Sequence, residues 1–209
     1  MAGYIYLPVP TAEMLDFCNE WLKGQKLKGK SPYVVLYNQY NSFIKGVMRQ
    51  IGFGVLSDLK SNDILYILSH GGAKGSSFIG AKKGNVKTNC RGVTHWEGGI
   101  LKKYSPQELA SLLKKEKLPM NFVDLRVYCC GSALVPDKSG VDKSYAQRLA
   151  IEMRKIGYAN VKITGYLGSV RSSYAIRQIP FLSEYTTSIH KGVEIDGKIL
   201  PASTKKVIY

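Results

Sequence analysis

The stretch Asp63-Ile64-Leu65-Tyr66-Ile67-Leu68-Ser69-His70-Gly71-Gly72 decides the fold: a short apolar run stops at a histidine and two glycines. Its length and apolar content are typical of a buried strand in a parallel sheet. A second run, Phe122-Val123-Asp124-Leu125-Arg126-Val127-Tyr128, stops in the same way at Cys129-Cys130-Gly131-Ser132. Functional side chains gather where the strands of an α/β sheet end, because the loops there lie at the surface. We therefore expect the histidine and the cysteine pair to meet at one edge of a sheet.

Strand-like and helix-like segments alternate around these two runs. Residues 3–9 predict an edge strand stopped by Pro8 and Pro10, and Thr11 is expected to cap the helix that follows. Asp196-Gly197 predicts a hairpin that closes the chain. The other expected elements are strands at 33–37 and 161–166, and helices at 43–51, after the capping box Ser105-Pro106-Gln107-Glu108, and at 144–156. This order predicts an α/β fold with a mostly parallel central sheet and helices on both faces.

The chain of 209 residues is expected to form a single domain, residues 1–209. Within it, residues 1–32 are interpreted as an N-terminal extension, and the glycine- and lysine-rich residues 71–99 as a long loop excursion containing a hairpin. No apolar run reaches the length of a membrane span, and the N-terminus does not resemble a signal peptide. We expect a soluble, stand-alone protein, either cytoplasmic or secreted as an effector without a visible Sec signal.

The chain is strongly basic, with 30 Lys and Arg against 15 Asp and Glu and a formal charge of +15. Such an excess favours a polyanionic partner. A nucleic-acid groove is not expected, because no concentrated basic helix or aromatic-basic motif occurs. Four cysteines, two of them adjacent, indicate free thiols and a reducing compartment. Cys90 and His95 lack the spacing of a zinc site with the cysteine pair, so no metal site is predicted.

The two strand ends together supply the groups that acyl transfer requires. A cysteine is a strong nucleophile only as thiolate, and an imidazole can take its proton and pass it to a leaving amine. A glycine after the histidine lets the main chain approach a substrate and offer its N–H to a developing oxyanion. The histidine and the cysteine pair are therefore candidate catalytic residues for cleavage of a peptide or amide.

This layout resembles the caspase-like clan of cysteine peptidases, which includes caspases, metacaspases, legumains, gingipains, separases and toxin self-processing domains. In that clan one hydrophobic strand ends in His-Gly, and another ends in a small residue followed by the catalytic cysteine. The Cys-Cys pair is most similar to metacaspases, and the size and closing hairpin to toxin self-processing domains. The pentapeptide Gln-Ala-Cys-x-Gly of caspases proper is absent. The resemblance implies a three-layer sandwich and a protein or peptide substrate.

The resemblance also implies roles for single residues. His70 would be the base and acid, Cys130 the nucleophile, and the N–H groups of Gly71 and Cys130 the oxyanion hole. Cys129 is the alternative nucleophile, but bulky Tyr128 would then stand where the clan has a small residue. The loop after the next strand maps to the specificity pocket, with Ser169 and Arg171 as candidate lining residues; Arg171 would receive an acidic side chain or simply lie at the surface.

Activation and an alternative function remain open from the sequence. The toxin self-processing relatives are switched on by inositol hexakisphosphate, so the resemblance implies an inositol phosphate activator and no other cofactor. The alternative is a catalytically inactive caspase-like domain, or an unrelated α/β module, that binds a polyanion or a partner protein through its lysines. In either case a bacterial effector or toxin-like protein is the expected context.

Overall fold

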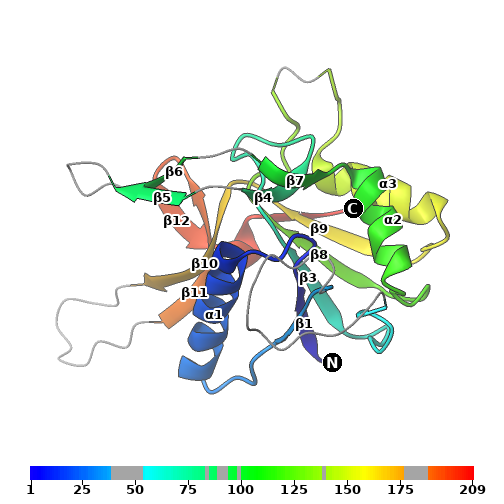
Figure 1. Cartoon of the computed structure of the whole chain (residues 1–209), viewed down its shortest axis with the longest axis horizontal. Coiled ribbons are helices and arrows are strands. Elements are labelled where there is room, and N and C mark those ends of the chain that lie inside the picture. Colours follow the sequence, from blue (N-terminus) through cyan, green and yellow to red (C-terminus); the bar gives the residue numbers. More distant parts are fainter. Residues whose placement is uncertain (39–53, 83–84, 89–93, 98–99, 138–139, 177–187) are drawn as a thin grey trace.

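A six-stranded sheet forms the centre of the computed structural model, which describes residues 1–38, 54–82, 85–88, 94–97, 100–137, 140–176 and 188–209. The strand order is β13-β9-β8-β3-β1-β2, and Figure 1 labels its four middle strands, β9, β8, β3 and β1. All neighbouring pairs are parallel except β13 with β9, which confirms the mostly parallel sheet. The strands are β1 (Gly3–Tyr6), β2 (Val34–Leu36), β3 (Ile64–Leu68), β8 (Asp124–Tyr128), β9 (Lys162–Tyr166) and β13 (Lys206–Ile208).

Three helices pack on this sheet: α1 (Ala12–Leu27), α2 (Pro106–Lys115) and α3 (Tyr145–Lys155). Trp21 of α1 packs against the rings of Tyr66 and Tyr128 on one face, while α2 and α3 pack together on the other (Figure 1). The expected caps are present, because Thr11 accepts a hydrogen bond from the N–H of Met14 and Ser105 forms a full capping box. The helix expected at 43–51 lies outside the described residues.

A second, three-stranded sheet lies on the α1 side of the molecule. It consists of β10 (Ser169–Ile176), β11 (Ser188–Ile195) and β12 (Lys198–Pro201). Asp196 and Gly197 join β11 to β12 with positive φ angles of 49° and 74°, the backbone of a tight hairpin turn. The predicted hairpin is therefore confirmed, but it does not close the chain. A 3-10 turn at Ala202–Thr204 leads into β13, which returns to the central sheet.

The N-terminal segment corrects two expectations. Strand β1 is not an edge strand, because it pairs with both β2 and β3, and β2 forms the edge instead. Residues 1–32 are not an extension either, since Ile5, Tyr6 and Leu7 are at most 1% exposed in the core. The physical reason is that Pro8 and Pro10 follow the last paired residue and remove no donor from the strand ladder.

The excursion expected at 71–99 is more ordered than its composition indicated. It contains the antiparallel pair β5–β6 and also strand β4, which pairs with β7 just beyond residue 99. The bounds are Asn85–Thr88 for β5, Thr94–Glu97 for β6, Ile79–Lys82 for β4 and Ile100–Tyr104 for β7. Strand β4 begins next to the histidine loop and pairs with it, so the excursion forms a wall of the site described below. Among the described helices, none is long and apolar enough to cross a membrane.

Candidate functional site

The strand register places His70 and Cys130 side by side. Leu68 of β3 is paired with Tyr128 of the neighbouring parallel strand β8, and His70 and Cys130 each follow two residues later. Both line a cavity of about 610 Å³ at the carboxyl edge of the sheet, which we call the strand-end cavity. Its lining residues are Asp16, Phe17 and Glu20 of α1, Leu68, Ser69 and His70, Tyr128 and Cys130, and Ser169, Val170 and Arg171 of β10.

Glycines allow the two strand-end loops to touch. A Cβ atom on Gly71 would lie 2.5 Å from the carbonyl oxygen of Cys130, and one on Gly131 would lie 2.2 Å from that of Gly72. Gly131 also has φ of 59°, a conformation that favours glycine. Its N–H donates to the carbonyl of Gly168 at 2.8 Å. The main chains after His70 and Cys130 are therefore in van der Waals contact. The hydrogen bond to Gly168, which follows β9, fixes the loop after Cys130 in this position.

Hydrogen bonds fix His70 through both its main chain and its ring. Its N–H donates to the carbonyl of Gly80 at 2.8 Å, and the N–H of Gly80 donates back at 3.0 Å. The ring Nε2 lies 2.8 Å from Oε2 of Glu13, whose side chain is only 7% exposed. A carboxylate at Nε2 favours the tautomer with the proton on that nitrogen, which leaves Nδ1 to exchange a proton with another group.

The two adjacent cysteines differ in access to solvent. Cys129 is fully buried, whereas Cys130 is partly exposed in the strand-end cavity. Burial, and to a lesser extent the neighbouring Cys130, raises the pKa of the Cys129 thiol well above its ordinary value. Cys129 is thus a buried thiol that resists ionisation, and Cys130 is the one that a substrate in the cavity can reach.

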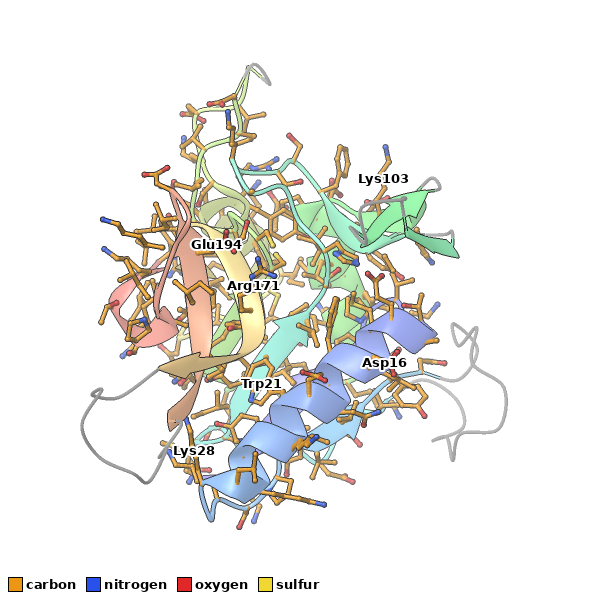
Figure 2. The ribbon with its side chains drawn as sticks, turned by 90° about the vertical axis from the view of Figure 1, so that its left-hand side faces the viewer. Asp16, Trp21, Lys28, Lys103, Arg171 and Glu194 are labelled. Atoms are coloured by element: carbon orange, nitrogen blue, oxygen red, sulfur yellow. The ribbon has the colours of Figure 1, made fainter. Side chains whose placement is uncertain are left out.

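Both candidate pocket residues, Ser169 and Arg171, line the strand-end cavity. The guanidinium of Arg171 is paired with Glu194, with Nε 3.0 Å from Oε2 and Nη2 in contact with the same oxygen. Figure 2 shows this pair on β10 and β11, with Asp16 on α1. An acidic substrate group would therefore have to compete with Glu194 for Arg171.

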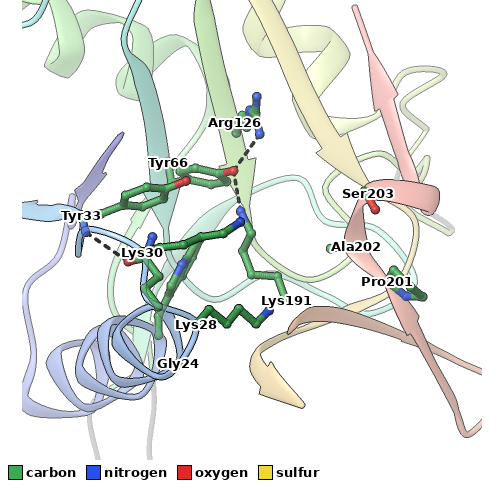
Figure 3. A pocket seen from close by; sticks show the side chains of 12 residues that line it. Gly24, Lys28, Lys30, Tyr33, Tyr66, Arg126, Lys191, Pro201, Ala202 and Ser203 are labelled. Carbon is green, nitrogen blue, oxygen red and sulfur yellow. Dashed lines mark hydrogen bonds between the residues drawn. The ribbon is translucent and has the colours of Figure 1, made fainter. Parts of the chain in front are cut away.

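A second cavity of about 340 Å³ gathers cationic side chains, and we call it the basic cavity. Lys28, Lys30, Arg126 and Lys191 line it beside the rings of Trp21, Tyr33 and Tyr66 (Figure 3). Arg126 is held by Asp124 at 2.8 and 2.6 Å, so the three lysines carry most of its excess charge.

Lys191 is the most perturbed of these cations. Its Nζ lies 3.9 Å from the centroid of the Tyr66 ring and 4.7 Å from that of Trp21, and it donates to the Tyr66 hydroxyl. Burial, followed by the charges of Arg126, Lys30 and Lys206, lowers the pKa of Lys191 to about 7. A bound anion would relieve this repulsion.

Glu13 is a residue of the strand-end site that sequence analysis missed. A glutamate in the first turn of a helix ordinarily interacts with the helix dipole and solvent, and nothing in the α1 sequence distinguishes it from that role. Only the packing of α1 on the sheet buries it and brings it to His70, 57 residues away. The available signal was its helical spacing from Asp16, Phe17 and Glu20, which line the strand-end cavity on the same side of α1 as Glu13.

The zinc alternative finds no support in the described part of the chain, where no group of three or more His, Cys, Asp or Glu side chains could hold a metal ion. Cys90 lies outside the described residues, and the side chain of His95 is not described either. Comparisons of the chain with protein-family models, with curated proteins and with solved structures give no match. The geometry of the site is therefore the basis for its interpretation.

Proposed function

We propose that this protein is a caspase-like cysteine endopeptidase that hydrolyses peptide bonds through a thioester on Cys130. The observation that carries the proposal is the shared cavity: an accessible thiol and a carboxylate-bound imidazole line it together, at the ends of adjacent parallel strands. The glycine-lined contact between the two loops supports it further. This is the arrangement that the resemblance to the caspase-like clan implies.

In the proposed reaction, His70 takes the proton of Cys130 and the sulfur attacks the carbonyl carbon of the scissile bond. The N–H groups of Gly71 and Cys130 stabilise the oxyanion. The C–N bond then breaks, and the leaving amine takes the proton from His70. His70 then takes a proton from water as its oxygen adds to the thioester carbonyl carbon; the C–S bond breaks, the carboxylic acid leaves, and His70 returns the proton to the sulfur.

Affinity labelling tests the proposal directly. A panel of peptide chloromethylketones, with different side chains before the reactive group, is incubated with the protein in the presence and absence of inositol phosphates. We expect at least one member to alkylate Cys130, identified by peptide mapping, and no labelling at this position in Cys130→Ala. Equal labelling of the wild type and Cys130→Ala, or no labelling under any condition, would contradict the peptidase proposal.

A polyanion such as an inositol phosphate is the proposed activator, and the basic cavity is its proposed site. Helix α1 lines both the basic cavity and the strand-end cavity. Tyr128 connects the two, because its ring centroid lies 4.8 Å from that of Trp21 and its hydroxyl donates to the carbonyl of Arg171 at 2.6 Å. An anion that moves Lys191 or Trp21 would therefore also shift Tyr128 and Arg171, which line the strand-end cavity.

The second candidate function is an inactive module that binds a polyanion without catalysis. The convergence of three lysines and an arginine in one cavity favours it independently of the thiol. The two functions differ in their dependence on the strand ends. Unchanged polyanion binding in Cys130→Ala and His70→Ala, together with a complete lack of thiol labelling, would favour the module over the enzyme.

Glu13 is proposed to position the His70 ring, and Glu13→Gln tests this role. We expect the turnover number to fall at least about tenfold with little change in KM, because the amide keeps the space and loses the charge that fixes the tautomer. Glu13→Asp, which keeps the charge, should recover part of the rate. Equal turnover in wild type and Glu13→Gln, or a loss that appears only as a lower melting temperature, would assign Glu13 a structural role.

A further inference from the structure

A third cavity, of about 280 Å³, lies against His70 and is distinct from the strand-end cavity. His70 lines both cavities, but Cys130 lines only the strand-end cavity. We call the third the apolar cavity, since Phe78, Ile79 and Ala81 line it together with three glycines. Its lining residues are His70, Gly71, Gly72, Ser76, Phe78, Ile79, Gly80, Ala81 and Lys103. We propose that the apolar cavity binds the side chain of the substrate residue directly after the scissile bond, and that this residue is apolar.

The proposal rests on the proposed function and follows from where the proton must go. When the C–N bond breaks, the leaving nitrogen takes its proton from the imidazole of His70, so that nitrogen must lie within hydrogen-bond reach of the ring. The residue that carries the nitrogen is then adjacent to His70. Because the acyl part is bonded to Cys130 in the strand-end cavity, the departing residue extends past His70, where the apolar cavity lies.

The lining of the cavity selects an apolar occupant. Ile79 and Ala81 form buried walls, each 1% exposed, while Phe78 is 40% exposed at the mouth. Among the described lining residues, Lys103 is the only one with an ionisable side chain besides His70, and its Nζ lies 4.5 Å from the centroid of the Phe78 ring. A buried carboxylate or ammonium would find few polar partners here, whereas an aliphatic or aromatic side chain gains by leaving water.

The cavity is also fixed relative to the reacting groups. Gly80 exchanges two main-chain hydrogen bonds with His70, and the hydroxyl of Ser69 donates to the same Gly80 carbonyl at 2.7 Å. A Cβ on Gly80 would lie 2.2 Å from the carbonyl of Lys102, so the strand pair β4–β7 approaches as closely as glycine allows. A side chain held here is thereby held at a set distance from the imidazole.

Sequencing of cleavage products tests the proposal. A proteome-derived peptide library with blocked amines is incubated with the wild type and inositol hexakisphosphate, with Cys130→Ala as background, and every new N-terminus is sequenced. The first residue of each new N-terminus reports the occupant of the apolar cavity. We expect Leu, Ile, Met and Phe to exceed Asp, Glu and Lys there by about tenfold, and the preference to fall several-fold in Phe78→Ala.

Two variants serve as controls. Phe78→Leu should keep the preference, and Met120→Ala, which removes a 48% exposed side chain outside the three cavities described here, should not alter it. Cleavage without a preference for apolar residues at this position, or with a preference unchanged in Phe78→Ala, overturns the inference and leaves the proposed function intact. Absence of any cleavage that depends on Cys130 overturns both.

Discussion

Cys130→Ala is expected to reduce peptide hydrolysis by about 10⁴-fold or more, because Cys130 is the one thiol among the described residues that line the strand-end cavity. The side chain is partly exposed and the methyl group of alanine fits the same space, so the fold should be retained. The measurements are the hydrolysis rate with the best peptide of the labelling panel and the melting temperature of each variant. Residual hydrolysis near the wild-type rate would exclude Cys130 as the nucleophile.

Cys129→Ala is the matched control, because it removes the neighbouring thiol. Its rate should remain within about threefold of wild type, while its stability should fall by about 1 kcal/mol, since a small buried cavity replaces the sulfur. The opposite result, an inactive Cys129→Ala and an active Cys130→Ala, would make Cys129 the nucleophile. That outcome would require the fully buried Cys129 to reach the cavity by a movement of the loop after β8.

The meeting of His70 and Cys130 could be predicted from the sequence because it depends on local patterns. Two short runs rich in apolar residues form the neighbouring parallel strands β3 and β8. Because these strands are paired in parallel register, His70 and Cys130, each two residues past a paired position, come to the same edge of the sheet. The caps Thr11 and Ser105 were predictable for the same reason, since a cap is decided within four residues. The choice of Cys130 over Cys129 came from the resemblance and agrees with the burial of each thiol.

The features that sequence analysis missed all depend on packing between distant segments. Lys28 and Lys30 follow α1, and Lys191 comes from β11, yet all three line one cavity with Arg126. Strand β1 lies inside the sheet because β2 and β3 pair with its two sides, and the prolines that follow it in the sequence do not reveal this pairing. Glu13 became a candidate only through burial. In each case the residue types are ordinary, and the tertiary arrangement makes them functional candidates.

Lys191→Met is expected to weaken polyanion binding by about tenfold or more and to remove activation. The ammonium lies among three other cations at low solvent exposure, where an anion gains more from each charge than it does at the surface. Binding of inositol hexakisphosphate is measured by calorimetry, and activation by the rate of Cys130 labelling with and without it. Lys114→Met makes the same change in net charge on α2, on the opposite face of the sheet, and should leave both quantities unchanged.

The melting temperature of Lys191→Met shows whether the variant has lost anion binding alone or has also lost its fold. The folded state lowers the pKa of Lys191 to about 7, below its value in the unfolded chain, so folding is opposed by protonation of this group and stability falls as pH drops from about 10 toward 7. Replacing Lys191 with methionine removes that penalty. We therefore expect the melting temperature of Lys191→Met at pH 7, without anion, to equal or exceed that of the wild type. A much lower value would trace its loss of binding to misfolding.

The same lysine should make anion binding depend on pH. Protonation of Lys191 destabilises the anion-free protein, but it favours binding of an anion. Above pH 7 the free Lys191 is mostly neutral, and an anion that requires the ammonium form must bind together with a proton. Affinity should therefore rise by about 25-fold as pH falls from 8.5 to 6.5, as the protonated fraction of a group with a pKa of about 7 does. Inositol hexasulfate is the appropriate probe, because its charge does not titrate in this range. In Lys191→Met the slope should disappear, and a wild-type affinity independent of pH would show that Lys191 does not contact the anion.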